Sequence, residues 1–172
     1  MKILKLFLII IFASGLAVSG CRCAKPGGAA KTGSAGTGAA ASAIVFKDLD
    51  GKPVNVSEAA GDRPLVLSFF ASWCRECPRE IPRNNEIYAD YARKGLLAMY
   101  AVAVGDSKQV AEKMIEKYGI EYPVLLDNES AAQDNFGILG LPYNLVLNSK
   151  GEIIYRGSTP PSEDILGKAI IK

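Results

Sequence analysis

The stretch "FFASWCRECPREIP", residues 69–82, places Cys74 and Cys77 directly after an apolar run and directly before a predicted helix. Two cysteines at this spacing suit a redox pair, part of a metal centre or a structural staple. A staple is weakly supported, because a disulfide that closes so short a loop constrains the unfolded chain little. A tetrahedral zinc centre needs four ligands, and the chain has no histidine and only two further cysteines, Cys21 and Cys23. The spacing therefore favours redox chemistry.

A helix that begins at Cys74 would make this pair reactive. Its first backbone N–H groups have no partner within the helix, and its dipole is positive at that end. Both effects favour the thiolate, which is the nucleophilic form of cysteine. We expect Cys74, the more exposed thiol, to attack and Cys77, one turn later and more shielded, to resolve the mixed disulfide. No cofactor is expected beyond this redox-active disulfide, and no metal.

Residues 1–20 have the charge, length and ending of a secretory signal peptide. Lys2 and Lys5 accompany an apolar run of 13 residues from Leu6 to Val18, shorter than the stretch of about 20 that spans a membrane. The ending "VSGC" resembles the lipobox of bacterial lipoproteins, in which the cysteine, here Cys21, carries the lipid. The alternative is an ordinary secreted precursor in which this cysteine has no role. We expect an extracytoplasmic lipoprotein, periplasmic or on the outer face of the cytoplasmic membrane.

Residues 21–43 are expected to form a flexible tether between the lipid anchor and a folded domain. Positions 24–43 contain eight alanines, five glycines, no acid and no aromatic residue, so they bury too little apolar surface to fold. Without residues 1–20 the chain carries 18 basic and 18 acidic side chains, because only Lys2 and Lys5 are lost. With no net charge and no basic block, binding to nucleic acid has no electrostatic support.

Residues 44–172 have the length of one domain with a hydrophobic core. Two near-continuous apolar runs, at 64–71 and 96–105, are typical of strands buried on both faces. Buried strands that alternate with helices and end in a hairpin indicate an α/β fold, with a central mixed β-sheet flanked by helices. The expected order is β-α-β-α-β-β-α after the N-terminal strands. The remaining elements are expected as two short strands around Asp50-Gly51, a helix from a Ser107 cap to Gly119, a short strand at 122–127, a short helix at 130–137, a hairpin at 144–157 and a final helix at 161–172.

One helix is expected over residues 75–93, between the two apolar runs, with Gly95 ending it. Pro82 lies inside this range and should kink the helix, because proline removes a backbone hydrogen bond. The residues expected along its buried side are Ile81, Asn85, Tyr88 and Tyr91 or Ala92.

Three segments resemble one known family. "FFASWCRECPREIP" resembles the active-site segment of thioredoxin-fold proteins, most closely the TlpA/ResA-like membrane-anchored thiol-disulfide oxidoreductases. "DLDGKPVNVSE" (48–58) is similar to the N-terminal extension of that family, and "GLPYNLVLNSKGEIIYRG" (140–157) to its cis-proline loop and final hairpin. The resemblance implies that residues 44–172 form a thioredoxin-like domain with an N-terminal β extension, and that the protein is an enzyme, a protein disulfide oxidoreductase.

The resemblance also implies roles for single residues. Cys74 matches the nucleophile and Cys77 the resolving thiol. Trp73 matches an aromatic residue that flanks the disulfide, although packing in the core is an equally good interpretation of it. Pro142 matches the cis-proline, and the backbone of Leu141 is expected to pair with a substrate peptide as an added strand.

Glu80 resembles a family glutamate near the disulfide, where a carboxyl group could exchange protons with Cys77. The alternative is a solvated helix residue that pairs with Arg83. Ser68 stands where thioredoxin carries a buried acid, so this chain lacks that group.

The family resemblance predicts a reductant of client proteins that contain disulfides, such as apocytochrome c during cytochrome c maturation. It implies electrons from a CcdA- or DsbD-type membrane partner. Two alternatives remain open: a disulfide-forming oxidase of the same fold, and a thioredoxin-fold module that binds copper or senses redox state. A peroxidase is less favoured, because the cysteines form a CxxC pair.

Overall fold

A computed structural model describes residues 44–171 of the chain. The predicted signal peptide (1–20), the tether (21–43) and the lipidated Cys21 lie outside the described residues. The strands are β1 (Val45–Lys47), β2 (Pro53–Asn55), β3 (Leu65–Phe70), β4 (Ala98–Val104), β5 (Val124–Asp127), β6 (Tyr143–Leu147) and β7 (Ile153–Gly157). The α-helices are α1 (Val56–Ala60), α2 (Ile81–Ile87), α3 (Lys108–Tyr118), α4 (Ala131–Phe136) and α5 (Glu163–Ile170).

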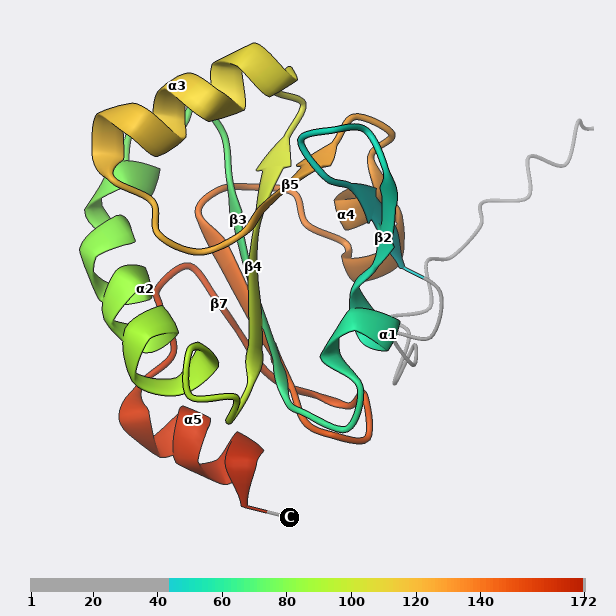
Figure 1. Cartoon of the computed structure of the whole chain (residues 1–172), viewed down its shortest axis with the longest axis vertical. Helices are drawn as coiled ribbons and strands as arrows, with labels where there is room; N and C mark the ends of the chain where they lie inside the picture. Colours follow the sequence, from blue (N-terminus) through green and yellow to red (C-terminus); the bar gives the residue numbers. More distant parts are fainter. Residues whose placement is uncertain (1–43, 172) are drawn as a thin grey trace, which may run out of the picture. The chain divides into compact units, whose positions relative to one another are not determined.

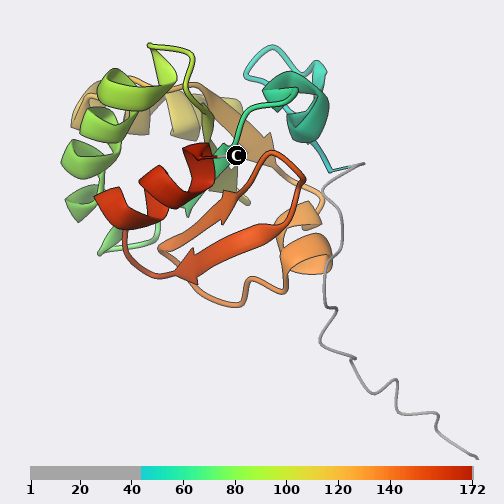
Figure 2. The same ribbon diagram turned by 90° about the horizontal axis from the view of Figure 1, so that it is seen from below.

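The strands of the described part form one mixed sheet in the order β2-β1-β5-β4-β3-β6-β7. The pairs β3–β4 and β4–β5 are parallel, and the other neighbours are antiparallel. Helices α2, α3 and α5 cover one face of the sheet, and α1 and α4 lie on the other (Figure 1). The view in Figure 2 shows the sheet between these two sets of helices. The predicted α/β class, the mixed sheet and the N-terminal β extension are confirmed.

Strand β3 is the centre of both halves of the core. All six of its residues are buried, as the apolar run predicted. Its odd-numbered residues pack with α1 and α4, where the ring of Phe69 contacts Phe46 and Phe136 in edge-to-face pairs at 6.3 and 5.8 Å between centroids. Its even-numbered residues face α2, α3 and α5, and one of them, Ser68, brings a buried hydroxyl to that side.

The predicted ends of α3 are confirmed by its caps. Ser107 Oγ accepts a hydrogen bond from the N–H of Val110 at the start of the helix. Gly119 ends it in the left-handed conformation, with φ of 65°, and donates its N–H to the carbonyl of Ile115. The hairpin β6–β7 and the pair β1–β2 also form where the sequence predicts them.

The connection after β3 is not one helix over residues 75–93, and that prediction is wrong. The chain forms a 3-10 turn at Cys77–Arg79, then α2, then a π-helical turn at Tyr88–Ala92. Pro78 lies at the start of the 3-10 turn and Pro82 at the start of α2, where a missing N–H removes no helical hydrogen bond. Pro82 therefore opens a new helix and does not kink a continuous one.

The buried side of α2 also differs from the prediction. Ile81, Asn84 and Ile87 are buried, whereas Asn85 is only partly buried. Asn85 donates from Nδ2 to the carbonyl of Gly119 at 2.8 Å, and its Oδ1 accepts from the N–H of Glu121 at 3.1 Å. This side chain therefore fixes the loop between α3 and β5 instead of joining the core.

The short strand expected at 122–127 and the short helix expected at 130–137 form as β5 and α4, but the expected order β-α-β-α-β-β-α leaves out one helix–strand pair. From β3 onward, with α2 and its flanking turns counted as one helix, the order is β-α-β-α-β-α-β-β-α. Within residues 44–171, no helix has the length and apolar character needed to cross a membrane.

Candidate active site

Cys74 and Cys77 form a disulfide directly beyond the end of β3, with their Cα atoms 5.5 Å apart. The backbone N–H of Cys77 donates to the Sγ of Cys74 at 3.2 Å. Such a donor stabilises negative charge on sulfur once the bond is reduced. The pair can therefore exist in the bonded form, and the chain around it favours Cys74 as the thiolate.

The expected environment of this pair needs two corrections. No helix begins at Cys74, because the first helical turn starts only at Cys77; the stabilising contact is a single N–H and not an α-helical end. The predicted contrast in exposure is small, since Cys74 is 7% and Cys77 is 3% exposed in the oxidised protein. Both sulfurs therefore lie at the edge of the core.

Glu80 lies between the 3-10 turn and α2 and is half-buried. Its carboxylate accepts a hydrogen bond from Asn144 Nδ2 at 2.9 Å. Burial raises the pKa of Glu80 above its usual value, and the hydrogen bond from Asn144 opposes that rise. Arg83 pairs with Glu86 and Glu163 instead of with Glu80. The interpretation of Glu80 as a solvated partner of Arg83 is therefore wrong.

Buried polar side chains adjoin Glu80, and we call Ser68, Asn84, Tyr122 and Asn144 the amide cluster. Ser68 on β3 lies directly opposite Asn144 on β6. Asn84 donates from Nδ2 to Ser68 Oγ at 3.0 Å. Burial raises the pKa of Tyr122 to about 12, a hydrogen bond with Asn84 opposes the rise, and the nearby charge of Glu80 adds to it. Sequence reasoning identified only Ser68 of these four.

A buried carboxylate holds the segment that leads into the cysteines. Asp106, which follows β4 and is 5% exposed, accepts hydrogen bonds from both the backbone N–H and the hydroxyl of Ser72, each at 2.6 Å. Ser72 precedes Trp73 and Cys74, so the carboxylate fixes the start of the active-site loop. Sequence reasoning missed the pair of Ser72 and Asp106. Its only signal was an acid placed just after the buried strand β4, whose carboxyl end lies beside the carboxyl end of β3.

The cis-proline loop leads into β6 at the edge of the sheet where β3 ends and the cysteine loop begins. The bond between Leu141 and Pro142 is cis, as the family resemblance predicted. The loop contributes Pro142 to a groove of about 330 Å³, which is also lined by Glu76, a residue that lies between the two cysteines in the sequence. The residues that line the groove are Glu76, Arg79, Glu80, Arg83, Pro142, Ser158, Thr159 and Pro160.

Two large apolar side chains are exposed: one directly before Cys74 and one shortly before the cis-proline. Trp73 is 65% exposed, so the interpretation of this residue as core packing is wrong. Leu139, three residues before the cis-proline, is 88% exposed and was not singled out from the sequence. Leu141, by contrast, is partly buried and packs against both halves of the core. Trp73, directly before Cys74, is therefore an apolar side chain that a partner can reach.

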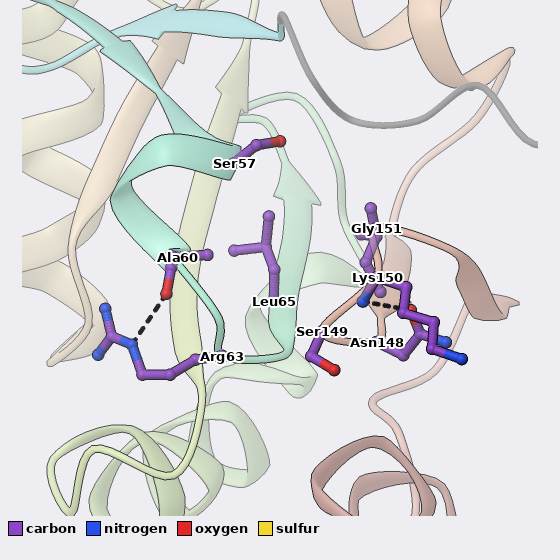
Figure 3. Close-up of a pocket in the computed structure, with 10 residues that line it drawn as sticks. Ser57, Ala60, Arg63, Leu65, Asn148, Ser149, Lys150 and Gly151 are labelled. Carbon is purple, nitrogen blue, oxygen red and sulfur yellow. Dashed lines mark hydrogen bonds between the residues drawn. The ribbon is translucent and has the colours of Figure 1, made fainter. Parts of the chain in front are cut away.

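A second cavity, of about 200 Å³, lies between α1 and the β6–β7 turn (Figure 3). Arg63 projects there, but its Nε donates to the carbonyl of Ala60 at 3.0 Å at the end of α1. Across the cavity Asn148 accepts from the N–H of Lys150 at 2.9 Å within the turn. None of the predicted site residues lines this cavity, and its polar groups serve local turns.

No part of the described chain, residues 44–171, gathers three or more histidine, cysteine, aspartate or glutamate side chains in a way that could hold a metal ion. The chemistry available at the site is that of two sulfurs, a carboxyl group and the hydrogen-bond donors around them.

A profile of the AhpC/TSA family matches residues 37–156. The chain belongs to the AhpC/TSA family. Among the members it resembles are the thiol-disulfide oxidoreductases ResA of Geobacillus thermodenitrificans, 30% identical over 116 residues, and of Bacillus subtilis, 29% identical over 111 residues. These matches cover 67% and 64% of this chain, and 66% and 61% of the relatives' own lengths.

Solved structures of similar proteins share the fold of this AhpC/TSA member. A thiol:disulfide interchange protein from Chlorobium tepidum is 26% identical, with a TM-score of 0.61 over 74% of this chain and 94% of that chain. A thiol-disulfide oxidoreductase from Bacteroides fragilis is 25% identical, with a TM-score of 0.64 over 75% of this chain and 96% of that chain. The predicted thioredoxin fold and the TlpA/ResA-like resemblance are confirmed.

Replacing Asp106 with alanine should lower the free energy of unfolding of the oxidised protein by about 2–3 kcal/mol, because two donors on Ser72 lose a charged acceptor. Urea denaturation measures the loss. Ser72→Ala removes one of the two bonds and should cost about half as much. A loss below about 0.5 kcal/mol for Asp106→Ala would show that the carboxylate does not hold this loop.

The raised pKa of Glu80 predicts a stability that depends on pH. The folded protein binds this proton more tightly than the unfolded chain, so the stability is fully present below the ordinary pKa of 4.5 and is lost as pH rises through the higher folded value. Relative to Glu80→Gln, which cannot titrate, the melting temperature of the oxidised wild-type protein should therefore fall over this range and then level off. A difference that stays constant from about pH 4 to about pH 8 would contradict the assignment.

Proposed function

We propose that this protein is an extracytoplasmic thiol-disulfide oxidoreductase that reduces disulfides in client proteins. The observation that carries the proposal is the disulfide between Cys74 and Cys77. A groove lined by Glu76, Glu80 and the cis-proline Pro142 supports it, because Glu76 lies between the two cysteines in the sequence. The similarity to relatives named thiol-disulfide oxidoreductase supports the type of reaction.

The reaction moves two electrons and two protons from this protein to a client. In the reduced protein the thiolate of Cys74 attacks one sulfur of the client disulfide, which forms a mixed disulfide and releases the first client sulfur as a thiolate. Cys77 then attacks the Sγ of Cys74, which closes the disulfide and releases the second client sulfur. Each client thiolate gains a proton, so the client ends as a dithiol. The N–H of Cys77, which donates to Cys74 Sγ, stabilises the attacking thiolate.

Glu80 is the acid–base group of this scheme. Its carboxyl group is half-buried, its pKa is raised by burial, and it lines the groove beside the cysteines. It takes the proton from the thiol of Cys77 as that sulfur attacks, and it returns a proton when the disulfide is reduced again.

The client binds over the apolar side chain of Trp73 and along the cis-proline loop. The backbone of Leu141 pairs with an extended client segment, and Pro142 keeps that segment over the disulfide. Trp73 is 65% exposed and lies directly before Cys74, so its apolar ring is accessible to a client that reaches the disulfide.

The proposed setting is the outer side of a bacterial cytoplasmic membrane, where disulfides form readily and a reductant has clients. A lipid on Cys21 holds the protein there, and the tether of residues 21–43 gives the domain reach. Apocytochrome c is the client suggested by the family resemblance, and a CcdA- or DsbD-type membrane protein the electron donor. Treatment with globomycin, or the change Cys21→Ala, should block the processing of the precursor and so change the mass of the product; an unaltered, still membrane-bound product would refute the anchor.

The direction of electron flow separates this proposal from a disulfide-forming oxidase. A reductant requires a reduction potential near that of thioredoxin, about −270 mV, whereas the strong oxidant DsbA lies at about −120 mV. A copper-binding module would bind Cu(I) stoichiometrically and would not reduce disulfides.

The purified protein should accelerate the reduction of insulin by dithiothreitol, and Cys74→Ser should abolish the acceleration, because the attacking sulfur is lost. Cys77→Ser should instead trap clients as mixed disulfides on Cys74, which diagonal gels and mass spectrometry identify. If the wild-type protein is no faster than Cys74→Ser, the proposed reaction is wrong.

A further inference from the structure

Two buried amide oxygens near Glu80 have no hydrogen-bond partner within residues 44–171: Oδ1 of Asn84 and Oδ1 of Asn144. Their side chains are 1% and 0% exposed. A buried polar atom without a partner costs free energy, so native proteins rarely keep one without a use. The oxygen of Asn144 is the more informative, because the same amide group is already bonded to Glu80.

In the structure, the amide of Asn144 uses its nitrogen as a donor but does not use its oxygen as an acceptor. Its Nδ2 donates to Glu80 Oε2 at 2.9 Å, and an ionised carboxylate can only accept. A protonated carboxyl group carries an O–H donor as well as an acceptor. It can therefore exchange two hydrogen bonds with a primary amide, one to the amide oxygen and one from the amide nitrogen. A protonated Glu80 would therefore supply the donor that the oxygen of Asn144 lacks within residues 44–171.

We propose that Asn144 is a positioning residue that holds Glu80 in both of its protonation states. Nδ2 donates to the ionised carboxylate, and Oδ1 accepts the O–H of the carboxylic acid. The inference rests on the proposed acid–base role of Glu80 in thiol-disulfide exchange. Glu80 gains a hydrogen bond as it gains a proton, and it keeps the other bond when the proton leaves for a thiolate. No electron moves in this step, and the carboxyl group stays in one place throughout the cycle.

The charged side chains near Glu80 are paired with other groups and do not hold its carboxyl group. Across the groove, Arg79 pairs with Glu76 at 2.5 Å, and Arg83 pairs with Glu86 and Glu163. On the core side, burial raises the pKa of Tyr122 to about 12, and this side chain bonds with Asn84. Cys77 is held in the disulfide. Among residues 44–171, Asn144 is therefore the side chain that satisfies the carboxyl group.

The first test follows the Glu80 carboxyl group itself. In the oxidised protein, the ¹³C shift of that carboxyl group is titrated by NMR in wild type, Asn144→Val, Asn144→Ser and Val146→Ala. Asn144→Val removes the donor and the acceptor, and because a charge-assisted bond is the stronger of the two, the titration midpoint should rise by about one pH unit.

Asn144→Ser keeps a hydroxyl that can donate or accept, so its midpoint should lie between those of wild type and Asn144→Val. Val146→Ala is the matched control. It lies on the same strand and face as Asn144, it is 0% exposed, and it should leave the midpoint unchanged. A midpoint in Asn144→Val and Asn144→Ser equal to that of wild type would overturn the proposal.

The second test asks whether Asn144 responds to the charge of the side chain at position 80. Glu80→Gln places both an N–H donor and a carbonyl acceptor there, like the carboxylic acid. At about pH 8 this change should raise the melting temperature of the oxidised protein by about 3 °C. The rise should be larger in the Asn144→Val background, because the ionised carboxylate there has also lost its donor, and intermediate in the Asn144→Ser background. An equal rise in all three backgrounds would show that Asn144 does not hold the group at position 80.

Both tests are equilibrium measurements on the oxidised protein and need no turnover. If insulin reduction fails while Glu80 still depends on Asn144, the proposed reaction is wrong and the pairing stands. If the reaction proceeds while Glu80 titrates independently of Asn144, the pairing is wrong and the reaction stands.

Discussion

Strand β3 is hydrogen-bonded along both edges, parallel to β4 and antiparallel to β6, over Leu65–Phe70. This double pairing decides where the chemistry lies. The carboxyl ends of β3 and β4 and the amino end of β6 must meet at one edge of the sheet. The cysteine loop, Asp106 and the cis-proline loop follow or precede these ends, so the register of one buried strand brings them together. A one-residue slip of β3 would turn Ser68 away from the amide cluster and Phe69 away from its aromatic partners.

The site combines an apolar surrounding with a few polar groups that are each tied to one partner. Asp106 uses both oxygens on Ser72, and Asn84 reaches the hydroxyl of Ser68. Buried polar groups cost free energy unless they are paired, so such pairs also fix the side chains that they join. Glu80 differs because its pKa is raised and its bond to Asn144 satisfies only one end of the amide. In our proposal, that imbalance lets Asn144 hold Glu80 in both of its protonation states.

Local signals in the sequence predicted much of the fold. The apolar run of β3, the Ser107 and Gly119 caps of α3 and the turn of the β6–β7 hairpin depend on neighbours in the chain, and all three predictions are confirmed. The cis bond before Pro142 came from family resemblance, because an isolated proline carries no sign of its isomer.

The errors and omissions also have a physical reason. Pro78 and Pro82 divide the segment after Cys74 into separate turns, which helical periodicity alone did not reveal. Within α2 the buried positions are Ile81, Asn84 and Ile87, which leaves Asn85 at the edge, where it bonds the loop between α3 and β5. The partners of Glu80 and Ser72 lie 64 and 34 residues away, so they are set by strand register and leave no local pattern.

The account depends on a disulfide that opens and closes reversibly. The most direct measurement equilibrates the purified protein in dithiothreitol or glutathione buffers from about −120 mV to beyond about −270 mV, alkylates the free thiols and maps the labels by mass spectrometry. The account predicts one two-electron transition in which Cys74 and Cys77 gain labels together on the reducing side. A pair that stays closed or stays open over the whole range, or cysteines that are labelled independently, would contradict it.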